Sequence, residues 1–348
     1  PAVVRRRNFI ASDAFPHDTP TGITYDSGDY EAAFARALEI SEYDSWRERS
    51  RNQPQDGDSL IGVGIATVVK GSGAKVITLG EHSRVMVDQS GEVTVHTGVS
   101  PHGQGTATTF AQMTADMLGV TPADVQVLHS DTDILPAGGG TGASRGMIAG
   151  GSSLQLVLED AHEKLTAIAA HLLGCSQGDV ALQDGLAFSQ QEPQKTVPFA
   201  RLAEAAHTEE LLPPGQEPGL DFQGNHVLGK SPYAFGAHVA VVEVSRETGH
   251  IKILRYVGIH DAGTIVNPML AEGQVHGAVA QGLGQALLED MAYSPEGQPL
   301  AGSLMDYALP RADNMPSFIF ETIETPSPIT GLGIKGIGEL PTPAAPPA

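Results

Sequence analysis

Two glycine-rich segments combine backbone donors with side chains that could bind an anion. Gly103-Gln104-Gly105 precedes a predicted helix, so backbone N–H groups and the helix dipole could hold a phosphate there. The Gln104 amide can both donate and accept hydrogen bonds, although a tight turn is the simpler explanation of this segment. Residues 138–146 also precede a helix and have the composition of an anion-binding nest, which we favour over a disordered linker. The groups of this second segment that suit an anion are Thr141, Ser144, Arg145 and Gly146.

Two later segments also place glycines beside a polar side chain. Gln274 lies on a predicted helix whose glycines recur near one side, which indicates close packing against the backbone; a neighbouring helix explains this equally well. Glu339 ends the segment 331–339, which contains Gly-x-Gly-x-x-Gly, but a Rossmann unit needs far more chain than the nine residues that follow. A carboxylate at the end of a flexible, apolar loop would be poorly solvated and therefore suited to act as a general base. The simpler alternative is that Glu339 is an ordinary solvated carboxylate.

Charge and cysteine content exclude several classes of function. The chain has 20 Lys and Arg against 41 Asp and Glu, a net charge of -21, which disfavours nucleic acid and anionic membranes as partners. Cys175 is the single cysteine, so the chain cannot supply the thiolates of an iron–sulfur cluster or a Cys-rich zinc site. No apolar run approaches the roughly 18 residues of a membrane span. We expect a cytoplasmic protein, or a periplasmic one if a preceding segment directs export.

The spacing of apolar residues predicts the elements that must position these segments. One amphipathic helix is expected at 30–52, behind a Ser27 cap. Two groups follow, each with a β-hairpin that leads to a Gly-Gln segment at a helix. A strand is predicted at 61–70, a hairpin at 84–97, a helix at 106–118, a strand at 125–128, a helix at 151–173, a polar and proline-rich interval at 177–232, a hairpin at 236–260 and a helix at 269–289.

The order of these elements predicts the fold class. Hairpins alternate with helices without a regular βαβ rhythm, which indicates an α+β fold rather than a doubly wound sheet. The similar spacing of valines and isoleucines in the two hairpins favours an internal duplication. A polar loop at 52–59 marks the expected boundary between residues 1–56 and a main domain at 57–348.

Ordered motifs occur along nearly the whole chain. They are RRRNFI at 5–10, PTGITYDSGDYEAA at 20–33, SPHGQG with TTFAQ at 100–112, the loop at 141–151, GQVHGAVAQGLGQAL at 273–287, GSLMDYALP at 302–310 and GIKGIGE at 333–339. Together they resemble the molybdenum-binding large subunit of the xanthine oxidase family, most closely the aerobic carbon-monoxide-dehydrogenase-type large chains. The resemblance implies that residues 1–56 end a first molybdopterin-binding half and that residues 57–348 form the second molybdopterin-binding domain.

The resemblance also implies a cofactor and a role for each candidate residue. The cofactor would be molybdenum-molybdopterin with a cytosine dinucleotide tail, held without any metal ligand from this chain. Gln104, flanked by Gly103 and Gly105, and Gln274 would hydrogen-bond the pterin or an oxygen on the metal. Glu339 would be the general base that takes a proton from the water-derived oxygen. The residues that would hold the phosphates and the tail are Thr141, Ser144, Arg145 and Gly146.

The predicted function is therefore that of the C-terminal part of a molybdenum hydroxylase large subunit. It would oxidise an aldehyde, an N-heterocycle or CO with water as the oxygen source, and pass electrons to a 2Fe-2S subunit and an FAD subunit. Because family members have a further N-terminal half, we expect this chain alone to be inactive. The alternatives are a non-catalytic fragment that binds cofactor or partner subunits, and an interaction protein that uses its acidic surface.

Overall fold

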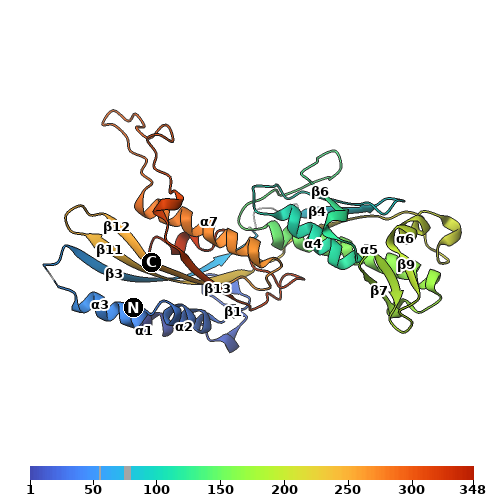
Figure 1. Ribbon diagram of the computed structural model, residues 1–348, viewed down its shortest axis with the longest axis horizontal. Helices are drawn as coiled ribbons and strands as arrows, with labels where there is room; N and C mark the ends of the chain where they lie inside the picture. The colour runs from blue at the N-terminus through green and yellow to red at the C-terminus, as the bar shows by residue number, and fades with distance from the viewer. Residues whose placement is uncertain (55, 74–79) are drawn as a thin grey trace. The chain divides into compact units, whose positions relative to one another are not determined.

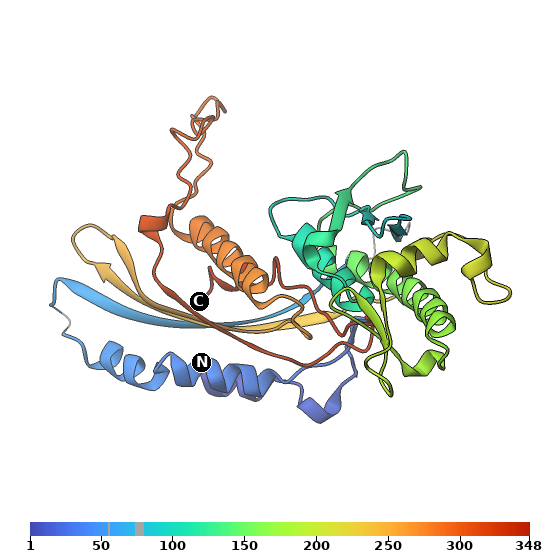
Figure 2. The same cartoon turned by 45° about the vertical axis from the view of Figure 1, so that its right-hand side comes forward.

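The chain forms two compact units in the computed structural model, which describes residues 1–54, 56–73 and 80–348 (Figures 1 and 2). Unit 1 comprises Pro1–Ser72 and Pro232–Ala348, and unit 2 comprises Gly73–Ser231. The boundary expected near residue 56 does not separate compact units. The N-terminal segment packs inside unit 1, where the Tyr30 ring stacks on Phe235 with their centroids 4.2 Å apart. No described helix is both long enough and apolar enough to cross a membrane.

Unit 1 is built on one four-stranded sheet. The strands are β3 (Ser59–Gly71), β11 (Tyr233–Ser245), β12 (Ile251–Asp261) and β13 (Phe318–Ile323), in the order β13-β12-β11-β3. Neighbouring strands are antiparallel except for the parallel pair β12 and β13. Helix α7 (Pro268–Leu287) packs Val275, Val279 and Leu283 against Tyr256 on one side of this sheet. Phe34 and Ala37 belong to a second apolar cluster, with Phe235 and Val257.

The predicted helix at 30–52 is two helices. α2 (Tyr30–Ile40) and α3 (Tyr43–Asn52) are separated at Glu42, whose φ of 56° is left-handed and interrupts the helix. The expected Ser27 cap is also wrong. Asp29 caps α2 by accepting a hydrogen bond from the Ala32 N–H at 2.9 Å. The short elements α1 (Ala2–Arg6), β1 (His17–Asp18) and β2 (Thr24–Tyr25) precede them.

Unit 2 has its own four-stranded sheet, with two long helices packed on it. The sheet order is β10 (Asp221–His226), β4 (Glu81–Val87), β5 (Val93–Thr97) and β6 (Val125–His129), and the helices are α4 (Thr106–Leu118) and α5 (Ser152–Leu173). Val85 and Val95 face each other across β4 and β5 and are fully buried. They share an apolar cluster with Phe110 of α4 and Leu154 of α5, so the alternating pattern of the hairpin buries one face against the helices.

The polar interval at 177–232 contains elements that were not predicted. A small antiparallel sheet is formed by β7 (Val180–Gln183), β8 (Leu186–Ser189) and β9 (Thr196–Pro198), and α6 (Phe199–Ala206) follows it. These strands have only three or four residues each, too few for an alternating pattern to stand out among the surrounding polar residues.

The two main sheets share a chain order. In unit 2 the hairpin β4–β5 leads through α4 to β6, which is parallel to β5. In unit 1 the hairpin β11–β12 leads through α7 to β13, which is parallel to β12. This shared order of hairpin, helix and parallel strand is what an internal duplication requires, and the α+β class is confirmed.

Candidate functional site

The first predicted loop lies at the N-terminal end of α4. Gly105 precedes the helix with a φ of 79°, a left-handed value that glycine adopts without strain. Gln104 stabilises the loop itself: its Nε2 donates to the Ser100 carbonyl at 2.8 Å, and its Oε1 accepts from the His102 N–H. A Cβ added at Gly103 would meet no described atom within 4 Å. The segment is therefore a tight turn, and its surface at Gly103 is open.

The second loop is joined to the first through Thr141. The Thr141 Oγ1 donates to the Ser100 carbonyl at 2.6 Å and lies 3.4 Å from the Gln104 Nε2, which donates to it. Ala143 and Ser144 have φ values of 49° and 54°. Two successive left-handed non-glycine residues are uncommon and persist where the surrounding structure holds them. Seven of the predicted residues thus lie on this pair of loops, at 103–105 and 141–146. The second loop ends at Gly146, where a π-helix (Gly146–Gly151) begins and leads into α5.

The Arg145 side chain lies beneath this loop. It is only 2% exposed, and its Nη1 donates to the Glu81 carboxylate and, at 2.9 Å, to the Gly140 carbonyl. The Gly139 N–H donates to the same carboxylate at 3.1 Å. Burial raises the pKa of the Glu81 carboxyl, an effect that the Arg145 guanidinium opposes. Within this chain Arg145 acts on the loop from inside, so the groups most available to a ligand here are those of the backbone.

A comparable ion pair holds the glycine loop of unit 1. Lys335 is 1% exposed, and its Nζ donates to Asp261 Oδ2 at 2.7 Å, Thr325 Oγ1 at 2.8 Å and the Ser27 carbonyl at 3.0 Å. The Lys335 N–H also donates to the Ala262 carbonyl at 2.7 Å. The segment 331–339, expected to be flexible, is therefore tethered to the end of β12 by a buried network. Sequence reasoning assigned Lys335 no role.

Glu339 follows this tether at the surface of unit 1. Its side chain is 50% exposed, and its Oε2 lies 2.7 Å from the Lys70 Nζ, at the end of β3. The poorly solvated environment expected from the sequence is absent in the described residues. The pair instead places a cation beside the predicted base and holds the Glu339 side chain in position.

Gln274 lies in the first half of α7, which has an open side. A Cβ added at Gly273 or Gly277 would meet no described atom within 4 Å. By contrast, a Cβ at Gly282 would come within 2.5 Å of the Thr342 carbonyl oxygen. Close packing within the chain therefore explains the later glycines of this helix but not the earlier two, which leave backbone surface next to Gln274 available to a ligand or another protein.

Sequence reasoning also missed a buried histidine pair beneath α7. The Nε2 atoms of His238 and His260 are 3.0 Å apart, and the His238 Nδ1 lies 2.8 Å from the Tyr256 hydroxyl. Burial lowers the pKa of His260 to about 3 and also holds the pKa of His238 well below its ordinary value. Both imidazoles are therefore neutral. The sequence indicates their burial only through the alternating pattern of β11 and β12, which places both positions on the inner face of the sheet.

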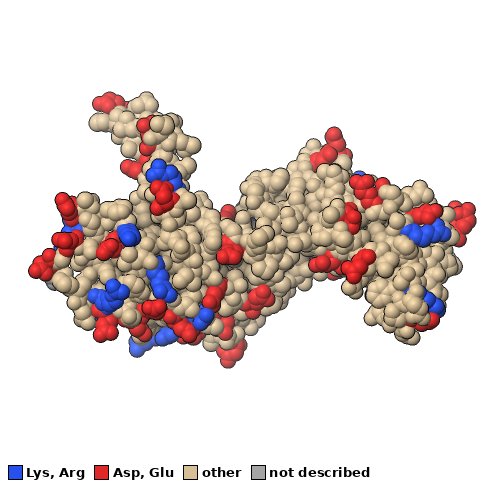
Figure 3. All heavy atoms as spheres, in the orientation of Figure 1, with Lys and Arg blue, Asp and Glu red and all other residues tan. Residues whose placement is uncertain are grey.

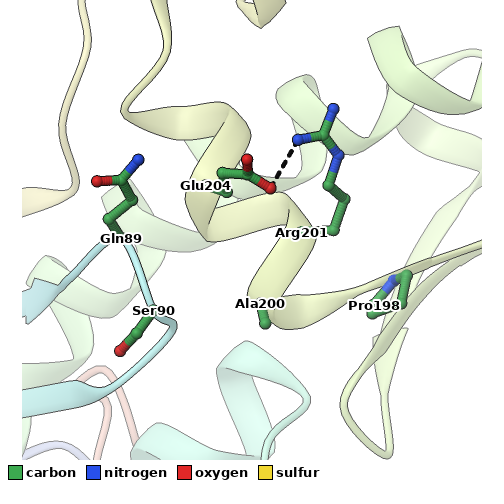
Figure 4. A pocket seen from close by; sticks show the side chains of 6 residues that line it. All are labelled: Gln89, Ser90, Pro198, Ala200, Arg201 and Glu204. Atoms are coloured by element: carbon green, nitrogen blue, oxygen red, sulfur yellow. Dashed lines mark hydrogen bonds and ion pairs between the residues drawn. The ribbon is translucent and has the colours of Figure 1, made fainter.

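The described residues hold no cluster of three His, Cys, Asp or Glu side chains suited to a metal ion. A surface hollow of unit 2 lies between the β4–β5 turn and α6 (Figure 4). It contains the Arg201–Glu204 ion pair, with 2.7 Å between Nη1 and Oε2, and both side chains are about half exposed. None of the predicted site residues lines it, and an exposed pair of this kind is an ordinary surface feature.

Comparison with known proteins identifies the family. The model of the molybdopterin cofactor-binding domain matches residues 36–316, which is most of the chain. The chain belongs to this family. The sequence is 32% identical to the carbon monoxide dehydrogenase large chain of Hydrogenophaga pseudoflava, over 98% of this chain and 43% of that protein. It is also 32% identical to the nicotine 6-hydroxylase large subunit of Paenarthrobacter nicotinovorans, over 100% of this chain and 44% of that protein.

Solved structures agree with the sequence relatives. The reconstituted CO dehydrogenase of Oligotropha carboxidovorans superposes with a TM-score of 0.92 at 30% identity, over 99% of this chain and 44% of that chain. This chain thus spans less than half the length of these relatives. The resemblance to xanthine oxidase family large subunits is confirmed, whereas the roles of the individual site residues stay predictions.

Proposed function

We propose that this chain is the C-terminal, cofactor-binding part of a molybdenum hydroxylase large subunit. The oxidised substrate would be an aldehyde, an N-heterocycle or CO, with water as the oxygen source. The observation that carries the proposal is the family match over residues 36–316, together with a TM-score of 0.92 to a CO dehydrogenase. When bound, molybdenum-molybdopterin supplies the redox chemistry of the reaction.

The residues present fit such a cofactor. Gly142, Gly273 and Gly277 lack positive φ values, and a Cβ at each would meet no described atom within 4 Å. No contact within the described chain therefore requires glycine at these positions, whereas close approach of a ligand to the backbone would. Backbone N–H groups of the loop at 138–146 would hold the phosphates, and Gln274 would hydrogen-bond the pterin.

The side chains around these groups would act as supports. Arg145 and Glu81 would fix the phosphate loop from below, and Gln104 would join it to the turn before α4 through Thr141. Glu339 would accept the proton from the attacking water-derived oxygen, and Lys70 would keep its carboxylate in place. Arg145 and Gln104 would thus hold the loops in place, whereas the sequence analysis expected both to contact the cofactor directly.

Finer features of the proposal concern the tail, the partners and the location. The tail would be a cytosine dinucleotide, and electrons would pass to a 2Fe-2S subunit and an FAD subunit in the cytoplasm. The names of the relatives as large chains or subunits support partner subunits in general. Acid release of CMP from the purified complex tests the tail, and co-purified iron and flavin test the partners.

Glu339→Gln in the native complex tests the assigned base. We expect about a 10²–10⁴-fold loss of kcat with molybdenum content unchanged. The matched control is Glu324→Gln, an exposed carboxylate of the same unit, which should retain full activity. Undiminished activity of Glu339→Gln would refute the role of Glu339. A complex that binds cofactor but turns over no aldehyde, N-heterocycle or CO would favour the non-catalytic fragment, an alternative that the short span relative to the relatives motivates.

A further inference from the structure

The end of β3 contacts the loop that carries Glu339 at two points. The Lys70 Nζ lies 2.7 Å from the Glu339 Oε2. The Ser72 Oγ accepts from the Gly336 N–H at 3.2 Å and donates to the Gly336 carbonyl at 3.4 Å. Lys70 and Ser72 are two residues apart in extended chain, so their side chains point to the same side. One short stretch of chain therefore contacts both the backbone and the carboxylate of the loop.

The sheet of unit 1 holds Ser72 in place. Ser72 is 0% exposed, and its N–H donates to the Pro232 carbonyl at 3.0 Å, which extends the pairing of β3 with β11 by one residue. Gly336 is also buried. A buried peptide group that loses a hydrogen-bond partner costs free energy, so the Ser72 hydroxyl favours one position of the Gly336 peptide.

The backbone on both sides of Glu339 is fixed. Gly336 lies three residues before it, and Leu340, which follows it directly, is 0% exposed. The Leu340 N–H donates to the Ile337 carbonyl at 3.3 Å, which closes a turn around the base. The Glu339 side chain itself is 50% exposed. Because a half-exposed Glu side chain samples several rotamers, the fixed backbone alone does not direct its carboxylate.

A cation beside Glu339 is notable in so acidic a chain. The sequence has 41 Asp and Glu for 20 Lys and Arg, and acidic side chains also outnumber basic ones on the face shown in Figure 3. The Lys70 and Glu339 side chains are 22% and 50% exposed, and ion pairs as exposed as this contribute little to stability. Ordering of the carboxylate therefore explains the pair better than stabilisation of the fold does.

We propose that Lys70 and Ser72 are positioning residues that together hold Glu339 for proton transfer. The inference rests on the proposed function, in which Glu339 is the general base. Ser72 sets the place of the loop backbone, and Lys70 sets the direction of the carboxylate. A base must lie within hydrogen-bond distance of the group that it deprotonates, and a misplacement of about 1 Å can lower a rate about 10²-fold.

Removal of the Lys70 cation in the native complex tests the direction of the carboxylate. Lys70→Met should lower kcat about 10–100-fold and leave KM within about twofold, because the loss is confined to the reacting geometry. Lys70→Arg keeps a cation and should stay within about threefold of the original kcat. The matched control is Lys252→Met, at the exposed start of β12, which should retain full activity. A kcat of Lys70→Met within about twofold of the original would overturn the proposal.

Removal of the Ser72 hydroxyl tests the place of the backbone. Ser72→Ala should lower kcat about tenfold, again with little change in KM. Ser59→Ala, at the other end of β3, removes a hydroxyl that donates to Glu243 Oε1 at 2.9 Å and should retain full activity. Hydrogen exchange of β3 and molybdenum content confirm folding and loading, and Ser72→Cys replaces Ser72→Ala if the latter does not fold. A folded, loaded Ser72 variant with unchanged kcat would overturn the role of Ser72.

The Glu339→Gln background separates positioning from a general structural role. If Lys70 acts through Glu339, adding Lys70→Met to Glu339→Gln should change the residual kcat by less than about twofold. A further loss of about tenfold would show that Lys70 acts elsewhere and would overturn the proposal. Full activity of Glu339→Gln alone would instead refute the base assigned under the proposed function. The two failures are therefore distinguishable.

Discussion

The glycine loops at 331–339 in unit 1 and 138–146 in unit 2 are each held by a buried ion pair. The two pairs differ in how many of their polar atoms have hydrogen-bond partners. In unit 1, Lys335 reaches three oxygen atoms, and Asp261 also accepts from the backbone N–H groups of Gly263 and Thr325. In unit 2, Glu81 Oε1 and Arg145 Nε are buried without a hydrogen-bond partner among the described residues. A buried charge is tolerated when its remaining groups are satisfied and costs free energy when they are not. The two units thus share an order of elements but differ in their buried ion pairs. The Lys335–Asp261 pair of unit 1 has its hydrogen bonds satisfied, whereas the Arg145–Glu81 pair of unit 2 leaves two polar atoms without a partner among the described residues.

The largest expected effect is that of Lys335→Met. It leaves Asp261 charged, buried and unpaired, so unit 1 should lose about 3–5 kcal/mol of free energy of unfolding. Lys252→Met on the exposed start of β12 is the control and should change stability by less than about 0.5 kcal/mol. Urea unfolding with hydrogen exchange resolved by unit provides both values. A loss below about 1 kcal/mol would show that the tether is not structural.

Glu81→Gln should cost less, about 1–3 kcal/mol in unit 2. The substitution removes the charge partner of Arg145 but also removes a carboxylate that burial already penalises, as the raised pKa of Glu81 indicates. The same hydrogen-exchange measurement gives the comparison. If Glu81→Gln lowers the free energy of unfolding as much as Lys335→Met or more, the two ion pairs do not differ in the way described.

The buried groups His260 and Glu81 should change the free energy of unfolding of their units in opposite directions as pH rises. The depressed pKa of His260, about 3, means that the unfolded chain binds a proton below about pH 6.5 that the folded chain does not. His260 alone should therefore cost unit 1 up to about 1.4 kcal/mol of unfolding free energy per pH unit as pH falls from 6.5 toward 3, and His260→Gln should reduce the slope of unit 1. Because burial raises the pKa of Glu81, its contribution to unit 2 stability should instead fall as pH rises above the ordinary Glu value. Equal slopes in both units would contradict this assignment.

The smallest effect concerns the helix N-termini. Asp29 caps α2 in unit 1, whereas α4 in unit 2 begins at Thr106 after Gly105, which provides no side-chain cap. Asp29→Ala should cost about 1 kcal/mol in unit 1, measured by urea unfolding. Asp29→Asn, which keeps an accepting side-chain oxygen, should cost only a few tenths of that. If Asn and Ala cost the same, the hydrogen bond to Ala32 does not stabilise α2.

Much of the framework follows from the sequence because long elements have strong periodic patterns. The predicted helix at 106–118 has the bounds of α4, and both predicted hairpins occur. The break at Glu42 was missed because the backbone turns at a residue whose side chain gives no sign of it. The elements β7 to β9 were too short to show a pattern, and β13 lies in a segment for which no strand was predicted.

The sequence predicted where the loops of the candidate site lie in the chain, but it could not predict which way their side chains point. Glycine content located the segments at 103–105 and 138–146, and the structure links them through Gln104 and Thr141. Sequence cannot show that Arg145 points inward, because its partner Glu81 lies 64 residues away. The Lys335 network joins residues as distant as 308 positions in the chain, and no local pattern encodes such a contact.

Molybdenum content of the native complex tests the central claim most directly. Elemental mass spectrometry on the complex that contains this chain should find stoichiometric molybdenum, together with iron in the same particle. The matched control is a known molybdoenzyme loaded in the same cells. Absence of molybdenum from this complex, while the control is fully loaded, would contradict the assignment of these loops to a molybdopterin cofactor.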